Sequence, residues 1–212
     1  AVVGVLRGGS LKMGVGIQHG FAPISKPRHI TRANANVLYE LDRRPAASVY
    51  EEYFGQELVQ RMQEEGLMRQ GSMYPLGIQG DRPDQWLLRT VLSLQEDGSL
   101  LLSDEIPEDA WIQLMIGSKQ LTLDAAYRAA QQAIRPLNRV AVALVFDSFV
   151  RRKFLGEQYA ALEVARIRQA LGPATPLAGC YTYGEQGSLD RSAFDGQTAV
   201  QTGSVLVVAL GT

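Results

Sequence analysis

The chain has 212 residues, of which 46% are hydrophobic, and its 21 basic and 22 acidic residues leave a net charge of -1. A chain of this length and composition is able to bury a substantial core without disulfides or metals, as one large domain or two small ones. Its balanced charge gives no electrostatic attraction to phosphate backbones or anionic lipid, so we expect neither nucleic acid nor membrane partners.

The first part of the chain is predicted to be β-structure. Strand-like patterns, separated by the Gly8-Gly9 turn and by polar residues, cover residues 1–6, 13–18, 28–32 and 36–41. The chain starts at Ala1 already inside such a pattern, which is typical of a fragment or a trimmed chain. Two short helices are expected next, one from Pro45 to Gly55 and one over residues 56–65 that ends at Gly66.

The middle of the chain returns to strands and then to a helix. Strands are predicted at residues 74–78, 86–94, 100–103 and 111–116, and Asp97-Gly98 marks a tight hairpin. Apolar residues at three-and-four spacing predict a helix over 123–135, which ends at Pro136.

The last part alternates strands with one long helix. The apolar run 140–146 predicts a central strand covered on both faces. A helix with a wide apolar face is predicted over 153–171, followed by strands at 177–183 and 198–210 and a polar loop at 185–197 between them. We expect the strands from residue 74 onward to form one mixed sheet, with both long helices packed against it.

These elements indicate an α+β fold. The predicted architecture is a layered sandwich of mixed β-sheet with packed helices, in which a strand meander is followed by β-α-β-α-β-β. A domain boundary is expected near residue 44, so that 1–44 and 45–212 form two units. The glycines near the start do not form a phosphate-binding fingerprint between a strand and a helix, and nucleotide binding is not expected there.

Cysteine and histidine usage excludes several further classes of protein. Cys180 is the only cysteine, so an intrachain disulfide is impossible, and two histidines without clustered cysteines give no metal site and imply no cofactor. No apolar run reaches the roughly 20 residues of a membrane span, and the opening lacks the basic start of a signal peptide. A cytoplasmic, reducing location is therefore predicted.

Three stretches, in order, carry a resemblance to a known family. They are residues 30–46, residues 146–163 with the run FDSFVR, and residues 179–185 with the sequence GCYTYGE, followed by the strand through Leu210. Together they resemble the FIST (F-box and intracellular signal transduction) family, as the end of its N-terminal domain followed by a whole C-terminal domain. Ser148 departs from the pattern, where the family often has cysteine. The resemblance implies a non-enzymatic sensory domain that binds small ligands such as amino acids.

The candidate ligand site lies where two predicted strands end. Arg151 follows the strand 140–146, and a guanidinium there would bind a ligand carboxylate with two parallel hydrogen bonds. Tyr181 and Tyr183 share one face of the next strand, and they would line the pocket or pack under a helix. Glu185 would receive an ammonium group, pair with Arg151, or be an ordinary loop residue. A solvated arginine at a helix start is the alternative reading of Arg151.

The leading hypothesis is a sensor of a small polar ligand, an amino acid or another carboxylate, with Arg151, Tyr181, Tyr183 and Glu185 at its site. A protein-interaction or substrate-recruitment module, with a signalling protein as partner, is the second hypothesis, and a large exposed apolar patch would favour it. A hydrolase using Cys180 or Ser148 is the third, although neither residue has a base nearby in the sequence. We expect Cys180 to be buried and slow to react, as unpaired cysteines usually are.

Overall fold

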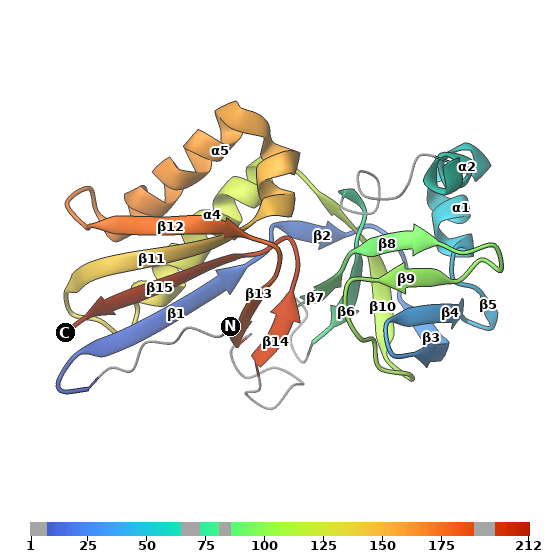
Figure 1. Cartoon of the computed structure of the whole chain (residues 1–212), viewed down its shortest axis with the longest axis horizontal. Coiled ribbons are helices and arrows are strands. Elements are labelled where there is room, and N and C mark those ends of the chain that lie inside the picture. Colours follow the sequence, from blue (N-terminus) through green and yellow to red (C-terminus); the bar gives the residue numbers. More distant parts are fainter. Residues whose placement is uncertain (1–7, 65–72, 81–85, 189–197) are drawn as a thin grey trace.

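The protein folds around two main sheets, which lie side by side in the computed structural model (Figure 1). The structure describes residues 8–64, 73–80, 86–188 and 198–212. A four-stranded sheet carries the two long helices, and a larger sheet of nine short strands has two short helices beside it. The predicted α+β class is confirmed.

The four-stranded sheet joins the two ends of the described chain. Its order is β1 (Lys12–Gln18), β15 (Val205–Gly211), β11 (Val140–Ser148) and β12 (Leu177–Thr182). Only the pairing of β11 with β12 is parallel, so the sheet is mixed. Helices α4 (Lys119–Ile134) and α5 (Phe149–Leu171) pack on one face, and β12 lies at an edge of the described sheet (Figure 1).

Small residues allow α4 to lie very close to the sheet. A Cβ atom added to Gly14 or Gly16 of β1 would come within about 2 Å of the backbone oxygens of Ala133 or Ala129. The facing side of α4 is a stripe of buried alanines that extends from Ala125 to Ala133. The helix begins at Ser118, whose hydroxyl accepts a hydrogen bond from the Leu121 N–H at 3.1 Å, as an N-cap residue should.

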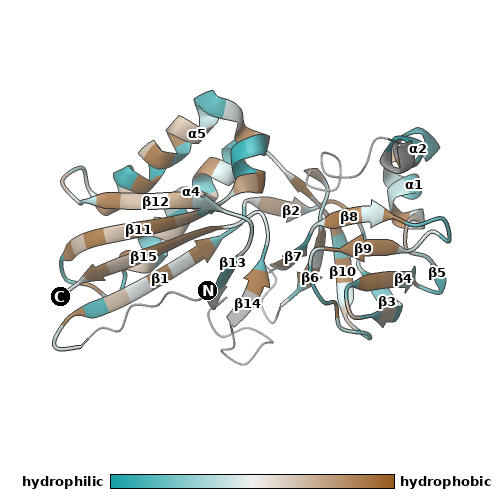
Figure 2. Cartoon of the chain, viewed as in Figure 1, coloured by the Kyte–Doolittle hydropathy of each residue, from teal (hydrophilic) through white to brown (hydrophobic). Residues whose placement is uncertain are grey.

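The opposite face of this sheet is apolar and largely open. Residues alternate across a strand, so the positions that point away from the helices share this face, and they are apolar except at the strand ends, where Ser148 and Thr182 lie. Figure 2 shows the resulting hydrophobic bands along β1, β15, β11 and β12. The exposed fraction is 49% at Met13, 37% at Val15 and 36% at Leu144. The hairpin of β13 (Glu185–Ser188) and β14 (Thr198–Gln201) lies against one end of the face, at Ile17 and Leu206.

The nine-stranded sheet curls back on itself. Its order is β7-β6-β10-β3-β4-β9-β8, with β2 (Phe21–Pro23) added on β10 and β5 (Arg44–Pro45) on β4. The remaining bounds are Arg28–Asn34 for β3, Val37–Leu41 for β4, Leu76–Gln79 for β6, Trp86–Arg89 for β7, Val91–Leu94 for β8, Leu100–Leu102 for β9 and Trp111–Gly117 for β10. Strands β7 and β8 stand at opposite ends of this order, yet only Thr90 separates them in the chain. The two ends of the sheet therefore meet at Thr90.

The interior of the curled sheet is a large apolar core. Ile30, Leu38, Leu76 and Leu100 are fully buried in it. Helix α1 (Ser48–Phe54) contributes Tyr50, whose hydroxyl donates a 2.7 Å hydrogen bond to the Tyr74 carbonyl. Helix α2 (Gln56–Glu64) follows after Gly55, which has the positive φ of 77° that ends α1.

Several sequence-based expectations about the sheets were wrong. The strands after residue 74 do not form one sheet, because those up to 117 belong to the curled sheet and those from 140 onward pair with β1. Strand β11 is central but alternates buried with exposed residues, because one face of its sheet is open. Cys180 lies on that open face and is exposed, not buried. Residues 185–188, predicted as loop, form strand β13.

The first 44 residues are shared between the two sheets. Strand β1 belongs to the four-stranded sheet, whereas β2, β3 and β4 belong to the curled sheet. The domain boundary near residue 44 stays a prediction. The predicted strand at 1–6 and the predicted helix end at Gly66 lie outside the described residues.

Candidate functional site

A groove lies between α5 and the edge strand β12. It has a volume of about 240 Å³. Its walls are formed by the helix-facing side of β11, by β12, and by the part of α5 from Val164 to Arg168. The lining is mostly apolar, with an acidic residue and an arginine among the polar groups: Val145, Asp147, Val164, Ile167, Arg168, Leu177, Ala178, Gly179, Cys180 and Tyr181. Because β11 and β12 are parallel, Asp147 and Tyr181 are register partners at their carboxyl ends. Open α/β sheets commonly bind ligands at such strand ends.

A break in helix α5 determines which of its basic side chains points into the protein. Gly156 has a φ of 72°, so α5 consists of a short first segment and a longer second one. The first segment turns Arg151 into the protein, where 1% of the residue is exposed, while Arg152 beside it stays partly exposed and pairs loosely with Glu157 at 3.9 Å. The second segment brings Glu163 back opposite Arg151, twelve positions later.

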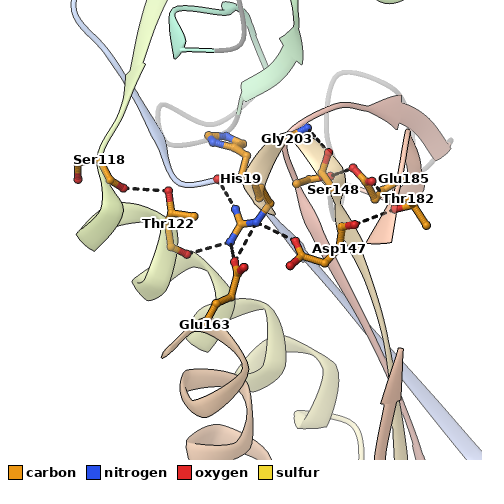
Figure 3. A network of polar contacts seen from close by, with 11 residues as sticks. His19, Ser118, Thr122, Asp147, Ser148, Glu163, Thr182, Glu185 and Gly203 are labelled. Atoms are coloured by element: carbon orange, nitrogen blue, oxygen red, sulfur yellow. Dashed lines mark hydrogen bonds and ion pairs between the residues drawn. The ribbon is translucent and has the colours of Figure 1, made fainter. Parts of the chain in front are cut away.

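Arg151 is the centre of a buried polar network. Figure 3 shows the network with His19, Thr122, Asp147 and Glu163 labelled. Its Nε donates to Glu163 Oε1 at 3.0 Å, and its Nη2 contacts the same oxygen and donates to the Thr122 carbonyl at 2.9 Å. Its Nη1 donates to the carbonyl oxygen of His19 at 2.5 Å. The network thereby ties α5 to α4 and to the end of β1. Most of the N–H groups of Arg151 are used by the protein itself.

Asp147 lies between this network and the groove. Its Oδ1 is 3.1 Å from Arg151 Nε but accepts a hydrogen bond from no described residue, and only 6% of the residue is exposed. Burial raises the pKa of Asp147 to about 8, because the attraction of Arg151 does not offset desolvation and the nearby charge of Glu163. The Oε2 atom of Glu163 also lacks a hydrogen-bond partner among the described residues. The carboxyl oxygens are thus only partly satisfied by the protein.

A second set of hydrogen bonds supports the ends of the strands. Glu185 is 2% exposed, and its two oxygens accept hydrogen bonds from the hydroxyls of Thr182 at 2.6 Å and Ser204 at 2.9 Å. Burial raises the pKa of Glu185, and the two hydroxyls and Arg151 counter part of that rise. The Ser148 hydroxyl is fully buried and accepts a hydrogen bond from the Gly203 N–H at 3.1 Å.

His19 closes the network on the side of β1. Its Nδ1 accepts a hydrogen bond from the Phe21 N–H at 3.0 Å, so this nitrogen carries no proton. Desolvation and the positive charge of Arg151 lower the pKa of His19 to about 4. The ring is therefore neutral at physiological pH and adds no second cation to offset the carboxylates.

Other parts of the described surface offer less to a ligand. One hollow beside α1 is lined by charged residues that include Arg28, which already pairs with Asp42 and Glu52. Another, at the far end of the four-stranded sheet, is lined mainly by small residues and backbone around Arg139 and Gly211. The described residues contain no group of three or more His, Cys, Asp or Glu placed to hold a metal ion. Within the same residues, no helix is both long and apolar enough to cross a membrane.

Comparison with known protein families agrees with this fold. A model of the FIST C domain matches residues 46–188, which is well over half of the chain, and a model of the FIST N domain matches residues 1–44. The chain belongs to the FIST family. FIST domains are associated with sensory functions in signal transduction, and the resemblance predicted from the sequence is confirmed. No curated protein and no solved structure gives a significant match.

The four residues predicted to bind ligand occupy different places in the FIST chain. Tyr181 lines the groove, and its ring is 5.7 Å from the guanidinium carbon of Arg152. Arg151 and Glu185 are buried in the network behind the groove. Tyr183 is 86% exposed and packs on Phe149, and it is not among the residues that line the groove. Their roles in ligand binding stay predictions.

Sequence reasoning gave little weight to the residues that define the inner end of the groove. A lone aspartate at a strand end, such as Asp147, is usually a cap or turn residue, so its position alone predicts no ligand contact. Glu163 ends the stretch 146–163 that carries the family resemblance, and His19 is one of the two histidines that gave no metal site. Two sequence features pointed to the network. Asp147 and Arg151 carry opposite charges four positions apart, and Glu163 lies between Ala160 and Ile167 on the apolar face of the predicted helix.

Proposed function

We propose that this FIST chain is a non-enzymatic sensory domain whose small polar ligand binds in the groove between α5 and β12. The observation that carries the proposal is a groove with apolar walls and one buried, incompletely satisfied carboxyl group, that of Asp147, at its inner end. Small-molecule sites typically combine an apolar lining with a few polar groups that fix the orientation of the ligand. In this proposal Tyr181 contacts the ligand, and Arg151 and Glu185 position the groups around it.

The buried network favours sensing over catalysis. Ser148, one of the two candidate nucleophiles, is fully buried with its hydroxyl bonded to the Gly203 N–H, so a substrate has no access to it. Cys180 is exposed, but a hydrolase needs a base that activates the thiol. His19, with its lowered pKa, uses its Nδ1 to accept the Phe21 N–H. An exposed free thiol also fits the predicted cytoplasmic location, because that compartment is reducing.

Thermal unfolding in the presence of small polar metabolites tests the proposal. A ligand at a hundred times its Kd stabilises the folded state by about 2.7 kcal/mol, which for a chain of this size raises the midpoint by roughly 5 °C or more. Val164→Phe fills the groove from α5 and should remove this shift. Leu162→Phe is the matched control, because Leu162 is similarly exposed on the same helix but does not line the groove. Equal shifts in both variants would place the ligand elsewhere.

The open face of the four-stranded sheet favours a second function, that of a protein-interaction module. Met13, Val15, Leu144 and Cys180 form an exposed apolar surface there, and such surfaces commonly bind other proteins. Sedimentation of the chain before and after Leu144→Glu tests whether this surface associates with a second copy. Association that depends on concentration and is lost in the variant would support the alternative, and a monomer in both cases would count against self-association through this face.

A further inference from the structure

The inner end of the groove holds more negative than positive groups. Three buried carboxyl groups, those of Asp147, Glu163 and Glu185, lie around the single guanidinium of Arg151, and all four residues are at least 94% buried. Arg151 hydrogen-bonds to Glu163 and to two backbone carbonyls, so it has little capacity left for a ligand anion. A carboxylate brought into this end would be repelled by those acids that are ionised, and Asp147 joins them above its pKa of about 8. The site predicted from the sequence to bind anions is therefore arranged to bind a cation.

Asp147 is the carboxyl group available to such a cation. Glu185 already accepts hydrogen bonds from Thr182 and Ser204, and Glu163 is not among the residues that line the groove. Asp147 does line the groove, and its Oδ1 has an ion-pair contact with Arg151 Nε at 3.1 Å but accepts no hydrogen bond from the described residues. Arg151 is shared with Glu163, so the Asp147 carboxylate is only partly compensated, and a donor that supplies both charge and hydrogens would recover free energy there.

The shape of the groove beyond Asp147 indicates what the cation is attached to. Val145, Val164 and Ile167 form apolar walls next to Asp147, and Arg168 lines the groove about a helical turn beyond Val164. A bare inorganic cation would gain nothing from apolar walls. A compact ammonium group on a short hydrocarbon chain matches both the carboxyl group and the walls, because ammonium is a point charge with three donors.

We propose that the groove selects a ligand with a primary ammonium group, which binds Asp147, and with a short apolar body along Val145, Val164 and Ile167. This inference rests on the proposed function, because it specifies the ligand class of the same groove. A carboxylate at the far end of the ligand reaches Arg168 and adds to affinity without being required. Binding therefore depends on the amine end, in contrast to the carboxylate-anchored site predicted from the sequence.

Calorimetric titration of the 212-residue chain with three probes tests this selection. The probes are n-pentylamine, pentanoate and 5-aminopentanoate, which share a five-carbon chain and differ in their charged ends. At pH 8.5 the amine is still protonated and most of Asp147 is ionised. We expect both amines to bind at least tenfold more tightly than pentanoate. Equal affinity for pentylamine and pentanoate, or no binding of either amine up to 10 mM, would overturn the inference.

Two variants assign the contacts. Asp147→Asn keeps the side-chain shape and should weaken both amines at least tenfold, a loss of about 1.4 kcal/mol or more. Arg168→Gln should weaken 5-aminopentanoate alone, because pentylamine has no carboxylate. Urea unfolding of Asp147→Asn checks that the variant is folded, and Val164→Phe, which blocks the groove without changing a charge, gives a second measure. Unchanged amine affinity in both Asp147→Asn and Val164→Phe would overturn the inference.

The outcomes also separate this inference from the proposed function. A neutral or anionic metabolite whose binding is lost in Val164→Phe but kept in Asp147→Asn would leave the groove as the ligand site and refute the ammonium selection. Ligand binding that survives Val164→Phe would refute both.

Discussion

The two sheets of this FIST chain differ in what they bury: mainly aliphatic side chains in the curled sheet, and a cluster of charged groups at one end of the four-stranded sheet. The curled sheet closes at Thr90 around a core of aliphatic residues such as Leu38 and Leu100. The four-stranded sheet keeps an open edge at β12 and an open apolar face, and it collects buried acids around Arg151 at the ends of its strands. Partly satisfied charges are costly inside a protein, and proteins tend to keep them at functional sites. In the proposed function, the curled sheet therefore acts as support and the four-stranded sheet holds the ligand site.

The largest expected effect comes from removing the central cation of the network. Arg151→Met leaves Glu163 buried without its partner, so we expect a loss of roughly 3–5 kcal/mol in the free energy of unfolding. Arg152→Met is the matched control and should change stability by less than about 0.5 kcal/mol, because Arg152 is partly exposed and weakly paired. Urea unfolding measures both variants. Similar losses in the two would show that the comparison between a buried and a solvated arginine is wrong.

A cavity introduced by mutation into the core of the curled sheet should lower the free energy of unfolding without changing ligand binding in the groove. Leu38→Ala removes a fully buried side chain from that core, with an expected cost of about 2–5 kcal/mol. Because Leu38 and the groove lie in different sheets, the affinity for any ligand of the groove should stay within twofold at a temperature where the variant is folded. Calorimetry and urea unfolding on the same sample test this separation. A large change in affinity would mean that the curled sheet takes part in recognition.

The pH dependence of the free energy of unfolding tests whether burial and the neighbouring acidic groups raise the pKa of Asp147. The pKa of Asp147 is raised to about 8 in the folded state from 3.8, so the folded protein holds a proton that the unfolded chain has lost over this range. Stability should therefore fall as the pH rises from about 4 to 8, by at most about 1.4 kcal/mol per pH unit from this group. Asp147→Asn should remove that part of the slope. Urea unfolding at pH 5, 6 and 7 compares the two proteins, and parallel curves would contradict the raised pKa.

The smallest expected effect concerns the open face. Cys180 is exposed, so a thiol reagent such as DTNB should modify it fully without denaturant, in contrast to the buried cysteine predicted from the sequence. Cys180→Ser should change the free energy of unfolding by no more than about 0.5 kcal/mol, as expected for a surface site. Protection of the thiol in the isolated chain would indicate that something covers this face.

The sequence was sufficient for most elements but not for their assembly. Apolar runs and turn residues predicted β11, α4 and the hairpin at Asp97-Gly98, because these signals are local. Which strands share a sheet depends on contacts between residues that are far apart in the sequence. The sequence of residues 12–18 does not indicate that β15 is the strand with which they pair. The same limit explains the error at Cys180. Alternation along β12 separates two faces, but it does not say which face a helix covers.

The candidate site was only half predictable for a similar reason. Arg151, Arg152 and Lys153 form one basic run in the sequence, and only the helix phase decides which of them is buried. Gly156 interrupts that phase, so helical periodicity cannot be extended from Arg151 to Glu163. The sequence predicted a ligand site at these strand ends, and that location stays a prediction. Which charged groups pair with one another inside the protein depends on the three-dimensional structure, and the sequence does not give it.

The pairing of β1 with β15 has a consequence for how the protein is made. Lys12 is the register partner of Gly211, so the two strands are separated by almost the whole described chain. A ribosome releases β1 long before β15 exists, and until then β1 lacks the neighbour that joins it to β11. Contacts between residues this distant in sequence slow folding and leave apolar segments exposed during synthesis. The curled sheet can begin to fold first, whereas the four-stranded sheet assembles only when β15 has been translated.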